Sequence, residues 1–348
     1  MGLLDFLRAF TGNWILAVTV ILVLLVVLIN GWTDAPNAIA TCISTRAISP
    51  KKAIIMAAIF NLFGVLFMTL VNATVAETLY KMVDFSGNSA DALAALCAAL
   101  VGILIWAVMA WYYGIPTSES HALIAGISGA AIALQGGFSG INGSAWVNVI
   151  YGLLLSTFFG FLSGYGISKL IVLICKDMHR RKTNRFFLKA QVAGGASMAF
   201  MHGAQDGQKF IGVFLLGVAL VEGDVSTHVF SVPIWLMILV SLVMGLGTSV
   251  GGYRIIKTVG MDMVKLKPYQ GFASDIAATI GLLCSSWFGI PVSTTHMKTT
   301  AIMGVGAAKR VSSIRWKIVR DMVLTWVLTF PGCGLIGFLM AKLFILIF

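Results

Sequence analysis

Charged residues are scarce in this 348-residue chain, where Asp, Glu, Lys and Arg make up only 11% and hydrophobic residues 59%. A typical soluble domain contains roughly 25% charged residues. The scarcity is spread along the whole chain, which excludes a soluble domain with a single membrane anchor. Apolar runs occur at 13–29, 53–71, 92–113, 146–175, 231–247 and 320–348. Each run approaches or exceeds the ~20 residues that a spanning helix needs, so the composition predicts an all-α integral membrane protein.

The sequence also lacks the cysteine and histidine pairs that bind metals or form a disulfide framework. Its five cysteines stand alone, at 42, 97, 175, 284 and 333, and no Cys-x-x-Cys pair occurs. Small buried apolar residues are the simpler interpretation of these cysteines. We therefore expect neither a cofactor nor a zinc site.

Acidic residues are fewer than basic ones, which gives the chain a net charge of +11. This excess does not indicate nucleic-acid binding, because 18 of the 24 Lys and Arg residues lie in four short segments, 46–52, 176–189, 254–267 and 309–320. Under the positive-inside rule these segments are cytoplasmic. The segments 71–91 and 221–231 contain more acidic than basic residues and are expected outside. The pattern predicts a multi-pass protein of the cell membrane.

Two motifs each occur twice, at nearly the same spacing. The sequence NGWTDAPNAIA at 30–40 resembles HGAQDGQKFIG at 202–212, where the two aspartates are offset by 172 residues. The sequence GIPTSESHALIAGISG at 114–129 resembles GIPVSTTHMKTTAIMG at 289–304, where the two histidines are offset by 175 residues. Repeats of this kind indicate a duplicated unit.

The repeats and the charge pattern together predict two inverted-topology halves, which are residues 1–175 and 190–348 with a basic cytoplasmic linker at 176–189. Each half should contain spanning helices and a helix broken at Gly or Pro, over 13–45 and 190–220. Each should also contain a re-entrant hairpin, over 92–135 and 270–306. The last arm, 296–306, is only about eleven residues or roughly 16 Å of helix, which is half a membrane. Inverted repeats with broken helices are the architecture of secondary transporters.

Asp34 and Asp206 stand beside the expected helix breaks. A carboxylate within the membrane costs at least ~2.5 kcal/mol even on the lenient insertion scale, so a function is the default hypothesis. Hard cations such as sodium prefer oxygen ligands. The alternative is that each aspartate only caps the next half-helix. We assign sodium sites at these two positions to Asp34, Thr33, Asn37, Asp206 and Gln205.

The two hairpin turns, at 116–121 and 291–296, each have a proline followed by hydroxyl residues, and we call them the hydroxyl turns. This pattern is typical of a helix start, where Ser or Thr caps the helix and free amides favour anions. Two such starts meeting at the midplane would offer donors to a tetrahedral oxyanion, although these residues could also serve only as caps. We assign the anion site to Thr117, Ser118, Ser120, Ser293, Thr294, Thr295 and the amide residue Gln208.

Five further polar residues near these motifs are candidates for proton or charge coupling. Lys209 could contact the anion or pair with the neighbouring aspartate. Asp275, on the first arm of the second hairpin, could be another cation ligand or an interfacial residue. His121 and His296 suit a proton relay or a supporting hydrogen bond better than a metal. The fifth candidate is Glu119.

At these motifs the sequence resembles the inorganic phosphate transporter (Pit) family. Residues 30–38 and 202–209 are similar to that family's two signatures, and residues 116–121 and 291–296 to its Pro-Ser-Ser-x-Ser-His elements. The resemblance extends over the whole chain in order and spacing. It implies a phosphate carrier coupled to sodium or protons, a dimeric assembly, and one central site formed by both aspartate motifs and both hydroxyl turns.

The sequence departs from the family pattern at three positions. Thr33 and Gln205 stand where the signature usually has Asn before Asp, which keeps an oxygen ligand but leaves the preferred cation open. Glu119 places a carboxylate in a hydroxyl turn. An ionised Glu119 would repel phosphate unless a cation or proton neutralised it, which favours proton coupling or a position away from the anion.

These observations predict a secondary active transporter that moves inorganic phosphate by alternating access around a midplane site. A sulfate permease of the same fold is the first alternative. Phosphate is favoured because it keeps a proton that it can donate to Asp34, Asp206 and Glu119, whereas sulfate cannot. An anion channel fits the membrane carboxylates less well. An intramembrane enzyme is disfavoured because a hydrolase needs one activated nucleophile, not a duplicated motif.

Overall fold

The computed structural model describes residues 2–83, 85, 89–222 and 230–347, which form helices, two isolated β-bridges and no strand. Six spans in this part of the chain are long and apolar enough to cross a membrane, and a seventh consists of α10 (Ile234–Val250) with the bent segment Tyr253–Asp262. The six are Trp14–Ser44 (α2 and α3), Pro50–Val71 (α4), Ser89–Tyr113 (α6), Gly143–Cys175 (α8), Arg180–Glu222 (α9) and Trp316–Ile347 (α14). The prediction of an all-α, multi-pass membrane protein is confirmed.

The first apolar stretch is interrupted at Asp34 and Ala35, between α2 (Trp14–Thr33) and α3 (Pro36–Ser44). The Asn13 side chain starts α2 by accepting hydrogen bonds from the next two free amides, as an N-cap does. Pro36 starts α3, at a position where its missing N–H has no helical partner in any case. The interruption expected over 13–45 is therefore present, and it leaves Asp34 at the end of a helix.

The second apolar stretch is not interrupted, which corrects the expectation of a broken helix over 190–220. α9 runs without a break from Arg180 to Glu222. Its glycines serve close packing instead, because a Cβ atom at Gly203 would lie 2.2 Å from the carbonyl oxygen of Asn61 on α4. A Cβ atom at Gly207 would lie 2.4 Å from a methyl group of Val65 on the same helix. Glycine thus lets α4 and α9 approach each other.

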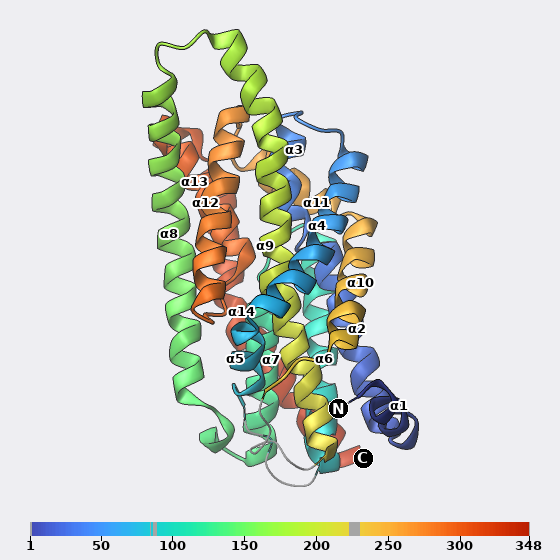
Figure 1. Ribbon diagram of the computed structural model, residues 1–348. Helices are drawn as coiled ribbons and strands as arrows, with labels where there is room; N and C mark the ends of the chain where they lie inside the picture. Colours follow the sequence, from blue (N-terminus) through green and yellow to red (C-terminus); the bar gives the residue numbers. More distant parts are fainter. Residues whose placement is uncertain (1, 84, 86–88, 223–229, 348) are drawn as a thin grey trace.

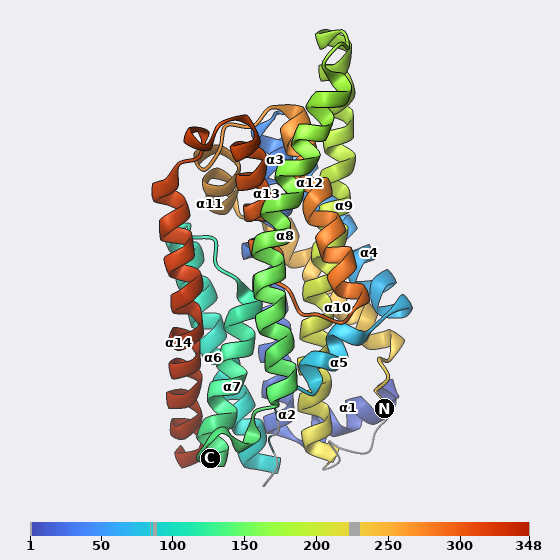
Figure 2. The same cartoon turned by 90° about the vertical axis from the view of Figure 1, so that its left-hand side faces the viewer.

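The basic segment between the halves is also mostly helical. A linker was expected over 176–189, but α9 begins at Arg180, so only residues 176–179 connect α8 to α9. Figures 1 and 2 show this connection at the end of the molecule opposite to both termini, together with the connections α3–α4 and α13–α14. These connections carry three of the four basic segments. The end that contains them is the one that the positive-inside rule predicts to be cytoplasmic.

Two helical hairpins turn back inside the molecule. The first consists of α6 and α7 (Glu119–Gln135), and the second of α12 (Pro268–Trp287) and α13 (Thr294–Lys309). Figure 2 shows both connecting segments crossing its middle. Gly114 and Gly289 open these turns with positive φ angles of 67° and 66°, a conformation that glycine adopts without strain. α13 has 16 residues, more than the expected eleven, but at roughly 24 Å it is still shorter than a membrane core.

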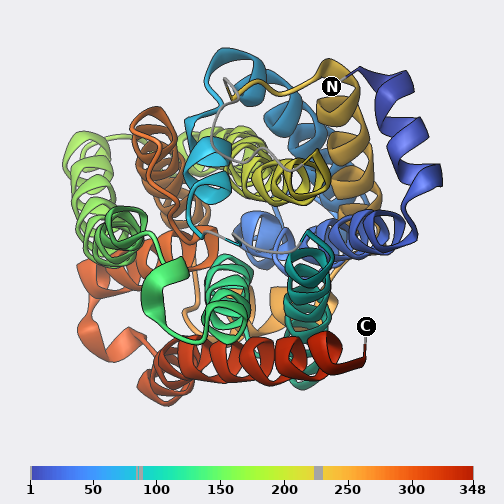
Figure 3. The same cartoon turned by 90° about the horizontal axis from the view of Figure 1, so that it is seen from below.

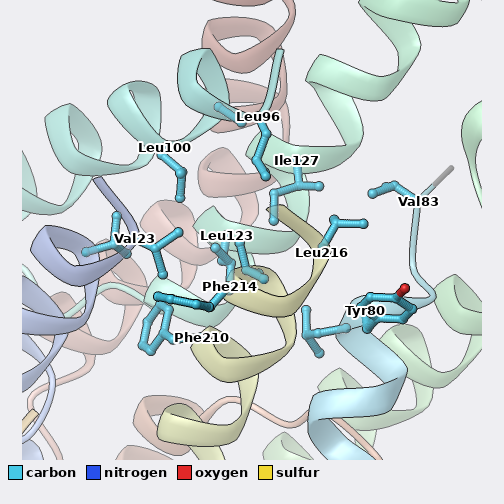
Figure 4. Packing of buried hydrophobic residues seen from close by; sticks show 14 of the residues in the cluster. Val23, Tyr80, Val83, Leu96, Leu100, Leu123, Ile127, Phe210, Phe214 and Leu216 are labelled. Carbon is cyan, nitrogen blue, oxygen red and sulfur yellow. The ribbon is translucent and has the colours of Figure 1, made fainter. Parts of the chain in front are cut away.

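The last long helix of each half packs against the hairpin of the other half. α14 lies along α6 and α7, whereas α8 lies along α12 and α13. Figure 3 shows α14 at the outer edge of the molecule beside the first hairpin. On the other side of that hairpin, Leu100 and Leu123 contribute to a hydrophobic cluster with Phe210 and Phe214 of α9 (Figure 4). The short helices α1 (Leu3–Gly12), α5 (Thr74–Tyr80) and α11 (Tyr253–Ile256) complete the described fold.

Candidate functional site

Four segments that are distant in sequence meet in the interior. They are the α2–α3 break, the start of α7, the middle of α9 and the start of α13. Hydrogen bonds connect Thr33 to Glu119, Ser120 to Asp206, and Thr295 to Asp34, across sequence separations of 86, 86 and 261 residues. The structure thus brings together both aspartate motifs and both hydroxyl turns, as the resemblance implied.

The two hydroxyl turns divide into caps and inward-facing residues. Ser118 accepts a hydrogen bond from the His121 amide at 3.3 Å, and Ser293 accepts one from the His296 amide at 3.1 Å. The capping interpretation is therefore correct for these two serines. It does not account for the residues that follow them, because the side chains of Ser120, Thr294 and Thr295 reach the aspartates. Thr117 is buried in the turn before α7.

Asp34 is surrounded by neutral partners. Its Oδ1 accepts hydrogen bonds from Asn37 Nδ2 at 2.7 Å and from the Thr295 hydroxyl. Asn37 also donates to Thr295 Oγ1 at 3.0 Å. Asp34 forms no ion pair with Lys or Arg among the described residues. A carboxylate, an amide and a hydroxyl are therefore grouped at the start of α3, which is an oxygen-rich set of the kind that hard cations prefer.

Asp206 has charged and titratable partners instead. Lys209 Nζ lies 2.7 Å from Asp206 Oδ1, and His202 Nε2 lies 3.3 Å from Asp206 Oδ2. Lys209 also donates to Ser120 Oγ and to the Val292 carbonyl, both at 2.6 Å. Of the two expected roles of Lys209, the structure shows the ion pair. It also places the ammonium group directly at the two hairpin turns.

The two aspartates form one cluster. Asp34, His202 and Asp206 each offer a ligand atom, and these atoms lie within 4.8 Å of one another. His202 and Asn30 were not among the predicted site residues. Asn30 Nδ2 donates to Asp206 Oδ2 at 3.4 Å. His202 and Asn30 both begin the repeated motif, four positions before its aspartate. This shared position in the two copies could have indicated them as site residues.

Several buried oxygen atoms of this cluster have no hydrogen-bond partner among the described residues. They are Asn30 Oδ1, Asp34 Oδ2, Asn37 Oδ1 and Glu119 Oε2. Leaving a buried acceptor unpaired costs about 1–3 kcal/mol. Asp34 and Glu119 are each only 2% exposed, so bulk water does not supply the missing hydrogen-bond donors. The residues present therefore fit a bound hard cation, which would take these oxygens as ligands.

The Nε2 atoms of Gln205 and Gln208 bond to groups other than the two aspartates. Gln205 Nε2 donates to Ser286 Oγ at 2.9 Å, at the end of α12. Gln208 Nε2 donates to the Asn72 carbonyl at 2.8 Å, just after α4. Gln205 Nε2 also donates to the Ile290 carbonyl of the second hairpin turn at 3.4 Å, and neither amide is hydrogen-bonded to Asp206 within the described chain. Their expected roles as ligands of the cation and the anion stay predictions.

His121 and His296 face each other behind the two helix starts. Their ring centroids are 4.5 Å apart. Both rings also pack on α14, where His121 lies 4.7 Å from Phe330 and His296 lies 3.8 Å from Trp326. The histidines thus join the two hairpin turns to α14 and do not belong to the group around Asp34 and Asp206.

Asp275 lies in a separate buried cluster, which excludes the interfacial alternative. It pairs with Lys298 of α13 and accepts hydrogen bonds from Thr41 at 2.8 Å and Gln191 at 2.5 Å. Lys298 was not among the predicted site residues. The sequence could have indicated this residue, because it is a charged residue within an apolar arm, two positions after the second hairpin histidine.

Comparison with known proteins gives the family. Residues 30–337 match the model of the Phosphate transporter family. A protein of Bacillus subtilis (strain 168) named "Probable low-affinity inorganic phosphate transporter" is 38% identical over 309 residues, which cover 89% of this chain and 91% of that protein. A protein of the same name from Rhizobium meliloti (strain 1021) is 38% identical over 313 residues, which cover 89% and 90%.

A solved structure also has the same fold. The structure named "The sodium-dependent phosphate transporter" superposes with a TM-score of 0.87, at 20% identity, and covers 97% of this chain and 100% of that chain. The family match extends over both aspartate motifs and both hairpin turns, which are the segments that meet in the buried cluster. The chain belongs to the phosphate transporter family.

Proposed function

We propose that this chain is a secondary active carrier that moves inorganic phosphate across the cell membrane together with sodium. Its family and its relatives support phosphate as the cargo. The solved structure of the same fold, which is named as sodium-dependent, supports sodium as the coupling ion. The observation that carries the proposal is the buried group of Asp34, His202 and Asp206, in which Asp34 Oδ2 has no hydrogen-bond partner among the described residues and Asp206 is paired with Lys209. As a member of a transporter family the chain is not an enzyme.

The cation belongs beside Asp34. This carboxylate accepts hydrogen bonds from neutral partners only, and its neighbour Asn37 has a further oxygen atom without a partner in the described chain. Asp206 is less suited to a free cation as long as Lys209 occupies its Oδ1. A sodium ion at Asp34 would neutralise a buried negative charge, which is worth several kcal/mol in a low-dielectric interior.

Phosphate belongs between the two hairpin turns. The starts of α7 and α13 lie near each other, since the rings of His121 and His296 in their first turns are 4.5 Å apart, and helix starts are favourable anion sites. Ser120, Thr294 and Lys209 lie there as hydroxyl and ammonium donors. Charge-assisted donors of this type form the stronger hydrogen bonds to phosphate. A cation bound at Asp34 lowers the repulsion between phosphate and the carboxylates, which couples the two cargoes.

We propose alternating access on the basis of the paired motifs and their packing. Two inverted repeats around one site are supported by the paired motifs and by the matching turns at Gly114 and Gly289. They are also supported by α8 and α14, each of which packs against the hairpin of the other half. Each hairpin would then close the site from one side in turn. α8 and α14 also carry many exposed apolar side chains, such as Leu162 and Leu328, which suit lipid contact and the homodimer that we propose with the family resemblance.

Proton coupling is the second candidate. Glu119 is buried and hydrogen-bonded to Thr33, and a carboxylate in this position can lose its charge by binding a proton instead of a cation. The same hairpin geometry also accommodates a sulfate permease. A passive anion channel is disfavoured because it has no use for a buried, cation-dependent carboxylate such as Asp34.

Uptake into proteoliposomes tests these candidates. Sodium and proton gradients are imposed separately while labelled phosphate is followed. We expect an inward sodium gradient at equal pH on both sides to drive phosphate accumulation, and excess sulfate to compete weakly. Accumulation driven by the proton gradient alone would favour Glu119 as the coupling group. Flux that ignored both gradients would contradict the carrier and support a channel.

A further inference from the structure

A second buried ionic cluster lies between α3, α9, α12 and α13, outside the group around Asp34 and Asp206. Asp275 of α12 pairs with Lys298 of α13 and accepts hydrogen bonds from Thr41 of α3 and Gln191 of α9. Lys298 Nζ also donates to Thr41 Oγ1 at 3.2 Å. The side chains of Asp275 and Lys298 are both 0% exposed. One ion pair thus connects four helices.

The ligands around Asp275 repeat the set around Asp34. At Asp34 the carboxylate is grouped with the amide of Asn37 and the hydroxyl of Thr295. At Asp275 it is grouped with the amide of Gln191 and the hydroxyl of Thr41. The difference is the Lys298 ammonium group, which has no equivalent at Asp34 in the described chain. The Asp275 cluster therefore has the composition of a hard-cation site that already contains a cation.

The first half of the chain has an apolar pair in place of this ion pair. At the offset of 175 residues between the hairpin motifs, Asp275 and Lys298 correspond to Leu100 and Leu123. Both leucines are fully buried in the hydrophobic cluster that Figure 4 shows. A hairpin of this kind can thus pack without charges. Replacing a buried ion pair by apolar residues is often neutral or stabilising, so the pair at Asp275 has a role other than packing.

We propose that Asp275, Thr41 and Gln191 form a cation site in which the Lys298 ammonium group is a permanent, tethered cation. The ammonium group compensates Asp275 without ever being released, so the charge of the second hairpin stays constant while free cations enter and leave elsewhere. This assignment goes beyond the proposed transport function and does not depend on it. It requires that a small monovalent cation occupy the site when the ammonium group is removed.

The substitution Lys298→Met removes the charge and keeps an unbranched side chain. Asp275, Thr41 and the Gln191 Oε1 atom, which is buried and unpartnered among the described residues, then remain as ligands. We expect sodium chloride to raise the Tm of the purified variant at least ~3 °C more than it raises that of the parent, relative to choline chloride at equal ionic strength. Both proteins carry Asp34→Asn, so that a failure of the central sodium site does not affect the comparison.

The double variant Asp275→Leu with Lys298→Leu is the matched control, because it copies the apolar pair of the first half. We expect it to fold and to show the parent's response to sodium. A folded Lys298→Met protein without the extra sodium shift would overturn the proposal. So would a single variant that failed to fold at every sodium concentration while the double variant folded. An equal extra shift in the double variant would also overturn it, since Asp275 would then not bind the cation.

Discussion

At the scale of single residues, Asp34 and Asp206 occupy matching motif positions but have different charge partners. Asp206 is paired with Lys209 and His202, whereas Asp34 is bonded to neutral groups. A buried carboxylate without a cation costs several kcal/mol. We therefore propose Asp34 as the carboxylate whose charge a sodium ion compensates, and Asp206 with Lys209 as the part of the site that faces the anion.

The substitution Asp34→Asn tests this division. The amide keeps the shape of the side chain and removes its charge, so we expect the stimulation of phosphate uptake by sodium to fall at least ~10-fold, which corresponds to ~1.4 kcal/mol. Initial uptake rates across a range of sodium concentrations measure the effect. Asp321→Asn, at an exposed carboxylate of α14, is the control and should retain the full response. An undiminished response in Asp34→Asn would contradict the cation assignment.

The sequence alone identifies two kinds of candidate site residue. One kind is a charged residue within an apolar run, and the other belongs to a helix-start pattern that neighbouring positions define. Asp34, Asp206 and the hydroxyl turns belong to these two kinds, because a carboxylate or a cap within an apolar run is visible without a partner. Asn30 and Lys298 belong to another class, since they bind aspartates on different helices, and Asn30 lies 176 residues from Asp206. Only the folded chain shows which of these side chains meet.

At the scale of helices, the prediction of a broken helix over 190–220 was wrong because glycine has two structural uses. A glycine in an apolar run is compatible with an interrupted helix and equally with a neighbouring helix at close range. α2 ends near Asp34, where Pro36 starts the next helix, whereas α9 is uninterrupted at Gly203 and Gly207, which lie against α4. The neighbour that decides between the two cases lies about 140 residues away, as the contact of His202 with Asn61 shows. Local sequence does not contain this information.

The close approach of α4 and α9 predicts a large effect of one methyl group. In Gly203→Ala the new Cβ atom would lie 2.2 Å from the Asn61 carbonyl oxygen, and overpacking of this kind costs about 1–3 kcal/mol. We expect the Tm of the purified protein to fall by roughly 3–6 °C. Gly166→Ala on α8 is the matched control, because nothing lies within 4 Å of its Cβ position. A helical Gly→Ala change there should leave the Tm unchanged or raise it.

At the scale of the whole molecule, charge predicts which end faces the cytoplasm, but not how the halves pack. Figures 1 and 2 place three basic connections at one end of the molecule and both termini at the other. The packing of α8 on the second hairpin and of α14 on the first was not predicted. Such an exchange leaves no local pattern, because apolar faces of α8 and α14 would fit either hairpin equally well.

Orientation is accessible to thiol labelling in a variant without its five native cysteines. Ser144 and Arg181 are exposed, and α8 separates them with 33 residues, or roughly 50 Å of helix, which exceeds the membrane core of ~30 Å. We expect a membrane-impermeant maleimide to label Ser144→Cys in intact cells, and to label Arg181→Cys only in inverted vesicles, since Arg181 lies in a basic segment. Labelling of both from one side would show that α8 does not cross the bilayer. Labelling with the sides exchanged would reverse the orientation, and the hairpin with the Asp275–Lys298 pair would then close the site toward the outside.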